Sequence, residues 1–204
     1  MVQDWKNENG ETFEQHAEAL LKPLYPWFVR DLENAFGKPL AGQKVLEIGC
    51  GPGFLNQPIV AAGCSLIAEL DISHQMLLKV KNRMVDERTI LIQGDSCALP
   101  FLSEKFSLVF SRGSVFFWKD LAVSFSEISR VMLPDGMALI GGGYGISTPD
   151  ELVAPVKVHA RQSNRKKDIP RIDMDSLMEK ISPFFSGIDL IKAPGRGFWL
   201  KCKK

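Results

Sequence analysis

The sequence predicts an α/β fold in which a mostly parallel sheet is covered by helices on both faces. Short apolar runs of strand length alternate with segments of helical periodicity from residue 44 to residue 142, and the first run leads directly into a glycine-rich loop. Strands separated by helices pair in parallel, and a parallel sheet needs helices on both faces. No repeat or low-complexity linker divides the 204 residues, so we expect a single domain.

Near the N-terminus, an apolar stripe of helical periodicity between residues 13 and 24 predicts a helix. Pro23 and Pro26 interrupt the stripe, because proline lacks the backbone N–H that a helix interior requires. The members of the stripe are Phe13, Ala17, Leu20, Leu21 and Leu24.

Five buried strands and three helices are expected between residues 44 and 142. Gly63 ends the first helix, and Ser73 is the expected N-cap of the second. A Pro-Asp-Gly turn at 134–136 separates the third helix from the fifth strand. The expected strands cover 44–49, 65–71, 89–95, 106–111 and 137–142, and the helices cover 54–63, 74–84 and 121–132.

Beyond residue 146 the alternation weakens. A helix over 149–162, a short helix over 175–181 opened by Asp175, and two final strands over 187–192 and 197–202 are expected. The two strands flank a four-residue turn and predict an antiparallel hairpin. The basic residues of the connecting segment are most simply a solvated loop; they are Arg161, Arg165, Lys166, Lys167 and Arg171.

Composition restricts the class of partner. An apolar fraction of 45% and a charged fraction of 24% are ordinary for a globular protein, and a net charge of +1 gives no field that favours nucleic acid or an anionic membrane. No apolar run approaches the roughly 18 residues of a membrane span, and the N-terminus lacks a signal-peptide pattern. The four cysteines and three histidines show no metal or disulfide spacing. We expect a cytoplasmic protein with no bound metal, no nucleic-acid partner and no membrane association.

The glycine-rich loop after the first strand is the strongest indication of a ligand site. Ligands of parallel sheets lie beyond the carboxyl ends of the strands, where this loop begins. A dinucleotide loop requires a third glycine at the position held by Phe54, and Glu47 would face the pyrophosphate unfavourably. A ligand that carries an amino group suits Glu47 better, so a nicotinamide dehydrogenase is disfavoured.

Five segments resemble the class I S-adenosylmethionine-dependent methyltransferases. "VLEIGCGPG" (45–53) resembles motif I, and the later segments follow in the family's order: "AELDIS" (68–73), "IQGDSCALPF" (92–101), "FSLVFSRGSVFFW" (106–118) and "EISRVMLPDGMALIGGG" (127–143). The ending "GFWLKCKK" resembles a small methyltransferase type 11-like branch. The resemblance implies a Rossmann-like, seven-stranded sheet with a C-terminal antiparallel hairpin, divided into a cap (1–40), a cofactor-binding core (41–145) and C-terminal helices and hairpin (146–204).

The resemblance also implies roles in binding S-adenosylmethionine and its product S-adenosylhomocysteine. Asp71 would accept from the ribose hydroxyls, Asp95 would accept from the adenine amino group, and Glu47 would face the ligand's ammonium. The full expected set of cofactor residues is Glu47, Gly49, Cys50, Gly51, Gly53, Asp71, Ile72, Asp95, Ser96, Ser111 and Arg112.

For the molecule that accepts the methyl group, the expected pocket residues are Ser114, Trp118 and Tyr144. No clear catalytic group is present among them. His16 and Tyr144 are the only candidates, and packing roles for His16 and Trp118 and a rim ion pair for Arg112 remain open. We expect methyl transfer to a small molecule. A non-catalytic S-adenosylmethionine-binding regulatory or partner protein is the alternative.

Overall fold

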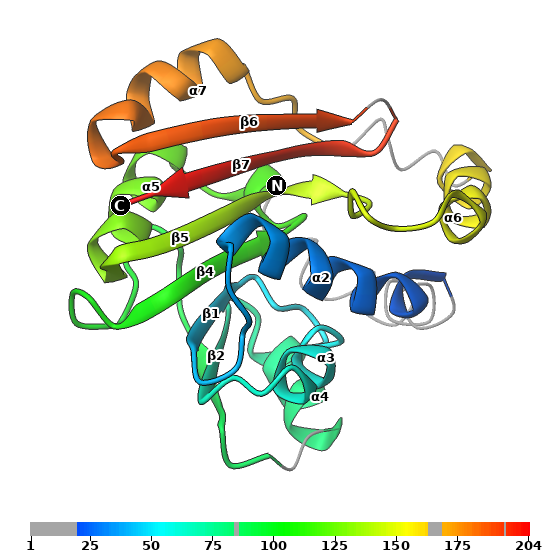
Figure 1. The fold of residues 1–204 in the computed structure, drawn as a ribbon, viewed down its shortest axis with the longest axis horizontal. Helices are drawn as coiled ribbons and strands as arrows, with labels where there is room; N and C mark the ends of the chain where they lie inside the picture. Colours follow the sequence, from blue (N-terminus) through cyan, green and yellow to red (C-terminus); the bar gives the residue numbers. More distant parts are fainter. Residues whose placement is uncertain (1–19, 84–85, 163–168, 194) are drawn as a thin grey trace.

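The computed structural model describes residues 20–83, 86–162, 169–193 and 195–204. These residues form one seven-stranded sheet of order β3-β2-β1-β4-β5-β7-β6 with helices on both faces (Figure 1). All neighbouring pairs from β3 to β5 are parallel, and β7 runs antiparallel to both β5 and β6. The expected sheet with its terminal antiparallel hairpin is confirmed.

The strand bounds agree with the apolar runs to within a few residues, except at β5. The strands are β1 Lys44–Ile48, β2 Leu66–Asp71, β3 Thr89–Gln93, β4 Phe106–Arg112, β5 Met132–Gly143, β6 Gly187–Ala193 and β7 Gly197–Lys203.

The helices in the described residues likewise follow the expected order. They are α2 Tyr25–Phe36, α3 Asn56–Ala61, α4 His74–Arg83, α5 Leu121–Val131, α6 Asp150–Gln162 and α7 Met174–Ile181, with 3₁₀ turns η3 Lys22–Leu24, η4 Val115–Phe117 and η6 Ser182–Phe184. None of these helices combines the length and the apolarity that a membrane span requires.

Three local expectations were wrong. Met132 begins β5 instead of ending α5, and residues 134–136 lie within β5, where the register with β4 shifts between Phe106 and Leu108. This irregularity lets the chain pass from helix to strand without a separate turn. Pro26 does not interrupt a helix, since it occupies the first turn of α2, where no N–H bond is lost. The N-cap of α7 is Asp173, whose carboxylate accepts from the N–H of Ser176, and not Asp175.

Alternating side chains divide the sheet into two apolar faces. Val45, Ile67 and Leu108 pack with α2 and α3, whereas Leu46, Ala68 and Val109 pack with α5 and α7. By this alternation Glu47 and Glu69 lie on the face that α2 and α3 cover.

Candidate functional site

The expected ligand residues come from the carboxyl ends of five parallel strands, which share one edge of the sheet (Figure 1). The order of the strands reverses between β1 and β4, so this edge includes the switch point at which α/β sheets bind ligands. Here β1 leads into the glycine loop, β2 ends at Asp71, and β4 ends at Arg112.

Two glycines of the loop have the same backbone conformation but different surroundings. Gly49 and Gly51 have φ of +74° and +54°, in the left-handed region that favours glycine. A Cβ on Gly49 would lie 2.3 Å from Cβ of Ser114, whereas a Cβ on Gly51 would meet no atom within 4 Å. The loop is therefore packed at Gly49 and open at Gly51. The third glycine, Gly53, admits Val80 of α4, whose methyl carbons would be 2.8 Å from a Cβ.

Asp71 joins the glycine loop to the start of α4. Its Oδ2 accepts from the N–H of Gly51 at 2.8 Å, and its Oδ1 accepts from the N–H of Ser73 at 2.8 Å. Burial raises the pKa of the Asp71 carboxyl, and these two N–H groups oppose the rise. Each oxygen keeps a second lone pair, so the carboxylate is able to accept two further hydrogen bonds. The neighbouring Ile72 is 46% exposed.

Beyond β3, the side chains of Asp95 and Ser96 have different hydrogen-bond partners. Oδ1 of Asp95 accepts from the N–H of Cys97 at 2.9 Å, which forms a local turn. Ser96 is buried, and its hydroxyl lies 2.9 Å from that of Ser124 on α5. The side chain of Ser96 is thus committed to packing against α5, and any contact with the ligand would come from its backbone.

Ser114 connects the loop that follows β4 to the glycine loop by hydrogen bonds. Its hydroxyl donates to the carbonyl of Ile48 at 2.9 Å, and it lies 2.6 Å from the hydroxyl of Ser111 and 3.0 Å from Nε1 of Trp118. One donor and two acceptor positions are the full capacity of a hydroxyl. This geometry gives the hydroxyls of Ser114 and Ser111 structural partners, and the pocket role of Ser114 stays a prediction. The ring of Trp118 packs against Phe125 with centroids 6.0 Å apart, which favours the packing interpretation of Trp118.

Arg112 lies among aromatic rings. Its guanidinium is 5.2 Å from the ring centroid of Tyr25, which stacks on Phe54 at 6.2 Å, and Arg83 covers the same Phe54 ring at 4.3 Å. Burial raises the pKa values of Tyr25 and Tyr144, and the positive charge of Arg112 opposes both rises. Tyr25 therefore belongs to the site, although no motif indicates it, because α2 reaches this edge only through the tertiary fold.

Two buried glutamates lie side by side beneath the loop. Glu47 of β1 and Glu69 of β2 are register partners, 3% and 0% exposed, and Nδ2 of Asn56 donates to Oε1 of Glu69 at 2.7 Å. Burial, followed by the charge of Glu69, holds the pKa of Glu47 well above its usual range, and burial also raises the pKa of Glu69. Burial raises the pKa of the adjacent Cys50 thiol well above its usual value, which makes a nucleophilic role unfavourable.

Sequence reasoning missed Glu69 and Asn56. A signal for Glu69 was present, since a charged residue in the middle of an apolar strand is rarely accidental. Four of the predicted residues lie outside the described residues: His16, Arg165, Lys166 and Lys167. The structure does not describe the side chain of Arg161, and Arg171 is exposed.

Comparison with known proteins shows a similarity to methyltransferases. The family model for the methyltransferase domain matches residues 46–140. A malonyl-[acyl-carrier protein] O-methyltransferase of Erwinia billingiae is 40% identical over 98 residues, which are 48% of this chain and 38% of that protein. The mouse mitochondrial arginine-hydroxylase NDUFAF5 is 34% identical over 125 residues, which are 61% of this chain and 34% of that protein.

A solved structure extends the likeness to nearly the whole chain. A Methanococcus maripaludis protein assigned as an S-adenosyl-L-methionine-dependent methyltransferase shares the fold with a TM-score of 0.79 and 28% identity, over 96% of this chain and 91% of that one. By contrast, the chain spans less than two fifths of the length of the two curated relatives. The likeness to these relatives therefore concerns the common domain.

Proposed function

We propose that this protein, whose residues 46–140 match the model of a methyltransferase domain, binds S-adenosylmethionine and catalyses methyl transfer to a small-molecule acceptor. The observation that carries the proposal is the junction of Gly51 and Asp71, where open space above a glycine adjoins a carboxylate with unused lone pairs. When bound, the cofactor supplies an electrophilic methyl group.

Asp71 is the proposed acceptor for the ribose hydroxyls. Its two N–H partners hold both oxygens in a fixed orientation, and adjacent hydroxyls provide two donors for one carboxylate. Asp95 is the proposed acceptor for the adenine amino group, and the exposed Ile72 offers an apolar surface for the purine ring.

Glu47 and Arg112 are the proposed partners of the amino-acid part of the cofactor. The carboxyl of Glu47 suits an ammonium, and the guanidinium of Arg112 suits a carboxylate. The two side chains interact electrostatically, since the charge of Arg112 lowers the pKa of Glu47 against the larger effect of burial.

On the acceptor side, we propose Tyr144 as a hydrogen-bond donor. Burial raises the pKa of its phenol, so it is protonated near neutral pH and is a poor general base. Catalysis would then rest on alignment of the acceptor, an effect worth up to about 7–11 kcal/mol. An acceptor that is already nucleophilic near neutral pH, such as a thiolate, another soft centre or an unprotonated amine, suits such a site. His16 is the other candidate base, and on this view His16→Ala should leave turnover largely intact.

Titration calorimetry tests the cofactor assignment. We expect micromolar binding of S-adenosylmethionine and S-adenosylhomocysteine and no measurable binding of NAD. Asp71→Ala should weaken binding by about 1.5–3 kcal/mol, because it removes the acceptor for two hydroxyls. The matched control is Asp135→Ala, an exposed carboxylate near the amino end of β5, at the opposite edge of the sheet. Unchanged affinity in Asp71→Ala would refute the ribose assignment.

Turnover separates an enzyme from a non-catalytic binding protein. Small metabolites would be screened for release of S-adenosylhomocysteine, with cofactor affinity measured in parallel. Saturable binding without turnover on any acceptor would favour the regulatory alternative. We further propose a cytoplasmic location. We also propose that the protein does not bind nucleic acid tightly, and a gel shift at physiological salt would test this absence of binding.

A further inference from the structure

Glu47 and Glu69 form a buried pair in which one carboxyl oxygen of each residue has no hydrogen-bond partner among the described residues. Both are partners in the parallel register of β1 and β2, where neighbouring strands are about 4.8 Å apart. Within the described part of the chain, no hydrogen-bond partner reaches Oε2 of Glu47 or Oε2 of Glu69. Two unpaired carboxylate oxygens at such burial would be costly, and a single proton held between them would satisfy both.

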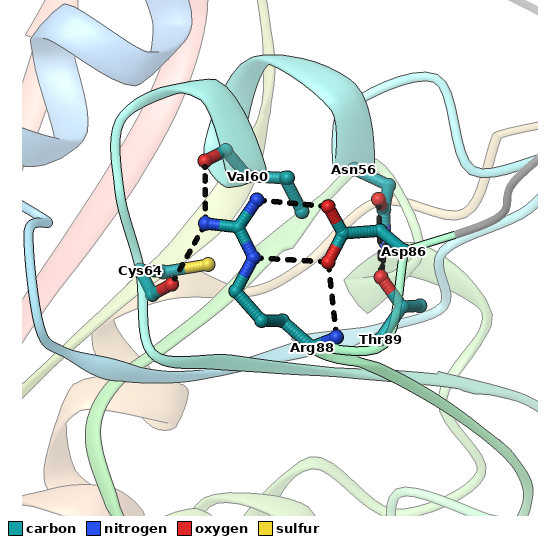
Figure 2. A network of polar contacts seen from close by, with 6 residues as sticks. All are labelled: Asn56, Val60, Cys64, Asp86, Arg88 and Thr89. Carbon is teal, nitrogen blue, oxygen red and sulfur yellow. Dashed lines mark hydrogen bonds and ion pairs between the residues drawn. The ribbon is translucent and has the colours of Figure 1, made fainter.

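The surroundings distinguish the two members of the pair. Asn56 Nδ2 donates to Oε1 of Glu69 at 2.7 Å and lies 3.1 Å from Oγ1 of Thr89, so Asn56 is itself held in place (Figure 2 shows Asn56 beside Thr89). Glu69 is thus favoured as the anion and Glu47 as the neutral acid. The other ionisable groups that act on the pair are Asp71 of β2, Arg112 of β4, Tyr25 of α2 and Cys50 of the glycine loop.

We propose that Glu47 and Glu69 share one proton and that Glu69 is a positioning residue, which takes this proton when the ligand's ammonium approaches Glu47. The O–H bond at Oε2 of Glu47 breaks, its electron pair stays on Glu47, and an O–H bond forms at Oε2 of Glu69. The pair keeps a charge of −1 throughout, so Glu47 ionises without releasing a proton to solvent. This inference rests on the proposed function for the identity of the ligand, but not for the existence of the shared proton.

Infrared difference spectroscopy detects the proton directly. At pH 7 the unliganded protein should show the C=O band of one buried protonated carboxyl, and this band should disappear in Glu69→Gln and in Glu47→Gln. In each variant the amide N–H₂ replaces the shared proton as donor to the remaining carboxylate. Saturation with S-adenosylhomocysteine should leave one such band in the wild-type protein. Absence of the band without ligand, or its loss on binding, would overturn the proposal.

Binding as a function of pH tests the positioning role. In Glu69→Leu, Glu47 has no neighbouring proton acceptor, so its ionisation must release a proton to solvent. Affinity for S-adenosylhomocysteine should then fall by up to about tenfold per pH unit below the pKa of Glu47. The wild-type profile should be flat over the same interval, and Glu69→Gln should restore it. A flat profile in Glu69→Leu would contradict the proposal.

A ligand without the ammonium gives the matched comparison. Methylthioadenosine has the nucleoside and the sulfur but no amino acid, so its affinity should not depend on pH in any of these variants. Glu47→Gln should weaken S-adenosylhomocysteine at least tenfold and leave methylthioadenosine unchanged. If neither compound bound the wild-type protein, the proposed function would fail, while the infrared band would still decide whether the pair holds a proton.

Discussion

Gly49 and Gly51 share a left-handed backbone, yet the structure assigns them different reasons for being glycine. The space beside Gly49 is filled by Ser114, the residue that fastens the β4 loop. The space beside Gly51 is open, and its N–H is bound by Asp71. The first glycine thus serves packing, and the second leaves open the space in which we propose that the ligand lies.

Alanine at each position should separate these roles. Gly49→Ala should lower the free energy of unfolding by about 2–4 kcal/mol, because backbone strain adds to a clash with Ser114. Gly51→Ala should lower it by about 1–2 kcal/mol, through backbone strain alone, while reducing affinity for S-adenosylhomocysteine at least tenfold. Urea denaturation and calorimetry would measure the two effects.

The control combines Gly49→Ala with a second substitution, Ser114→Gly. It removes the atoms that a Cβ at position 49 would meet, so Gly49→Ala should cost less in that background than in the wild-type protein. Equal stability losses for Gly49→Ala and Gly51→Ala would show that Ser114 does not distinguish the two sites.

Among the secondary-structure elements, α3 depends on Arg88, a residue that directly precedes β3. The guanidinium of Arg88 binds both carboxylate oxygens of Asp86, at 2.9 and 2.8 Å, and also donates to the carbonyls of Val60 and Cys64 near the end of α3 (Figure 2). The ion pair orients the guanidinium toward the carbonyls of Val60 and Cys64, the first of which also accepts from the N–H of Gly63. A short helix of six residues is therefore closed by a side chain that precedes β3.

This arrangement predicts an acid-dependent contribution to stability. Arg88 lowers the pKa of Asp86 to about 2, so the pair stabilises the fold above the unfolded-state pKa near 3.8 and loses this contribution as the pH falls toward 2. Asp86→Asn should lower Tm by a few degrees at pH 7, and the difference from wild type should shrink between pH 4 and pH 2. Because both side chains are partly exposed, salt should reduce the difference as well.

Arg88→Lys distinguishes charge from geometry. Lysine keeps the positive charge but not the planar fork that reaches Asp86 and two carbonyls together. Its Tm at pH 7 should be at least as low as that of Asp86→Asn. A Tm equal to wild type in Arg88→Lys would mean that the carbonyl contacts contribute nothing.

Across the whole molecule, residues 145–150, which follow Tyr144, are held between α2 and the hairpin turn. Asp31 of α2 is buried, and its Oδ1 accepts from the N–H of Ser147 at 2.9 Å. From the other side, Arg196 donates to the carbonyls of Gly145 and Thr148 at 2.9 and 2.6 Å. The backbone beyond Tyr144, the proposed hydrogen-bond donor to the methyl acceptor, is thus positioned by α2 and by Arg196 of the hairpin.

Removing the α2 anchor should destabilise the whole domain. Asp31→Ala leaves the N–H of Ser147 without its acceptor and should lower the free energy of unfolding by about 1–3 kcal/mol in urea denaturation. Asp31→Asn keeps an acceptor oxygen and should lose less.

An exposed carboxylate provides the control for this measurement. Asp135 forms an ion pair with Lys38 at 3.4 Å, and both side chains are exposed, so Asp135→Ala should change stability by less than about 0.5 kcal/mol. A comparable loss in Asp31→Ala and Asp135→Ala would exclude the anchoring role.

Local chemistry alone determined most of the architecture. Apolar runs, caps and glycines depend on neighbours a few residues away, so the seven strands, the hairpin and the glycine loop with Asp71 could be placed from the sequence. The errors at Met132 and Pro26 concern element boundaries, where a strand irregularity or a first helical turn overrides the local pattern.

Only the tertiary structure decided which side chains share the candidate site. Tyr25 lies beside Arg112, and Asn56 beside Glu69, across separations in sequence that no local pattern spans. The hydroxyl of Ser114, expected in a pocket, is saturated by Ile48, Ser111 and Trp118. Burial and hydrogen-bond partners depend on how elements pack, and these two quantities set whether a polar side chain can meet a ligand or can only hold the fold together.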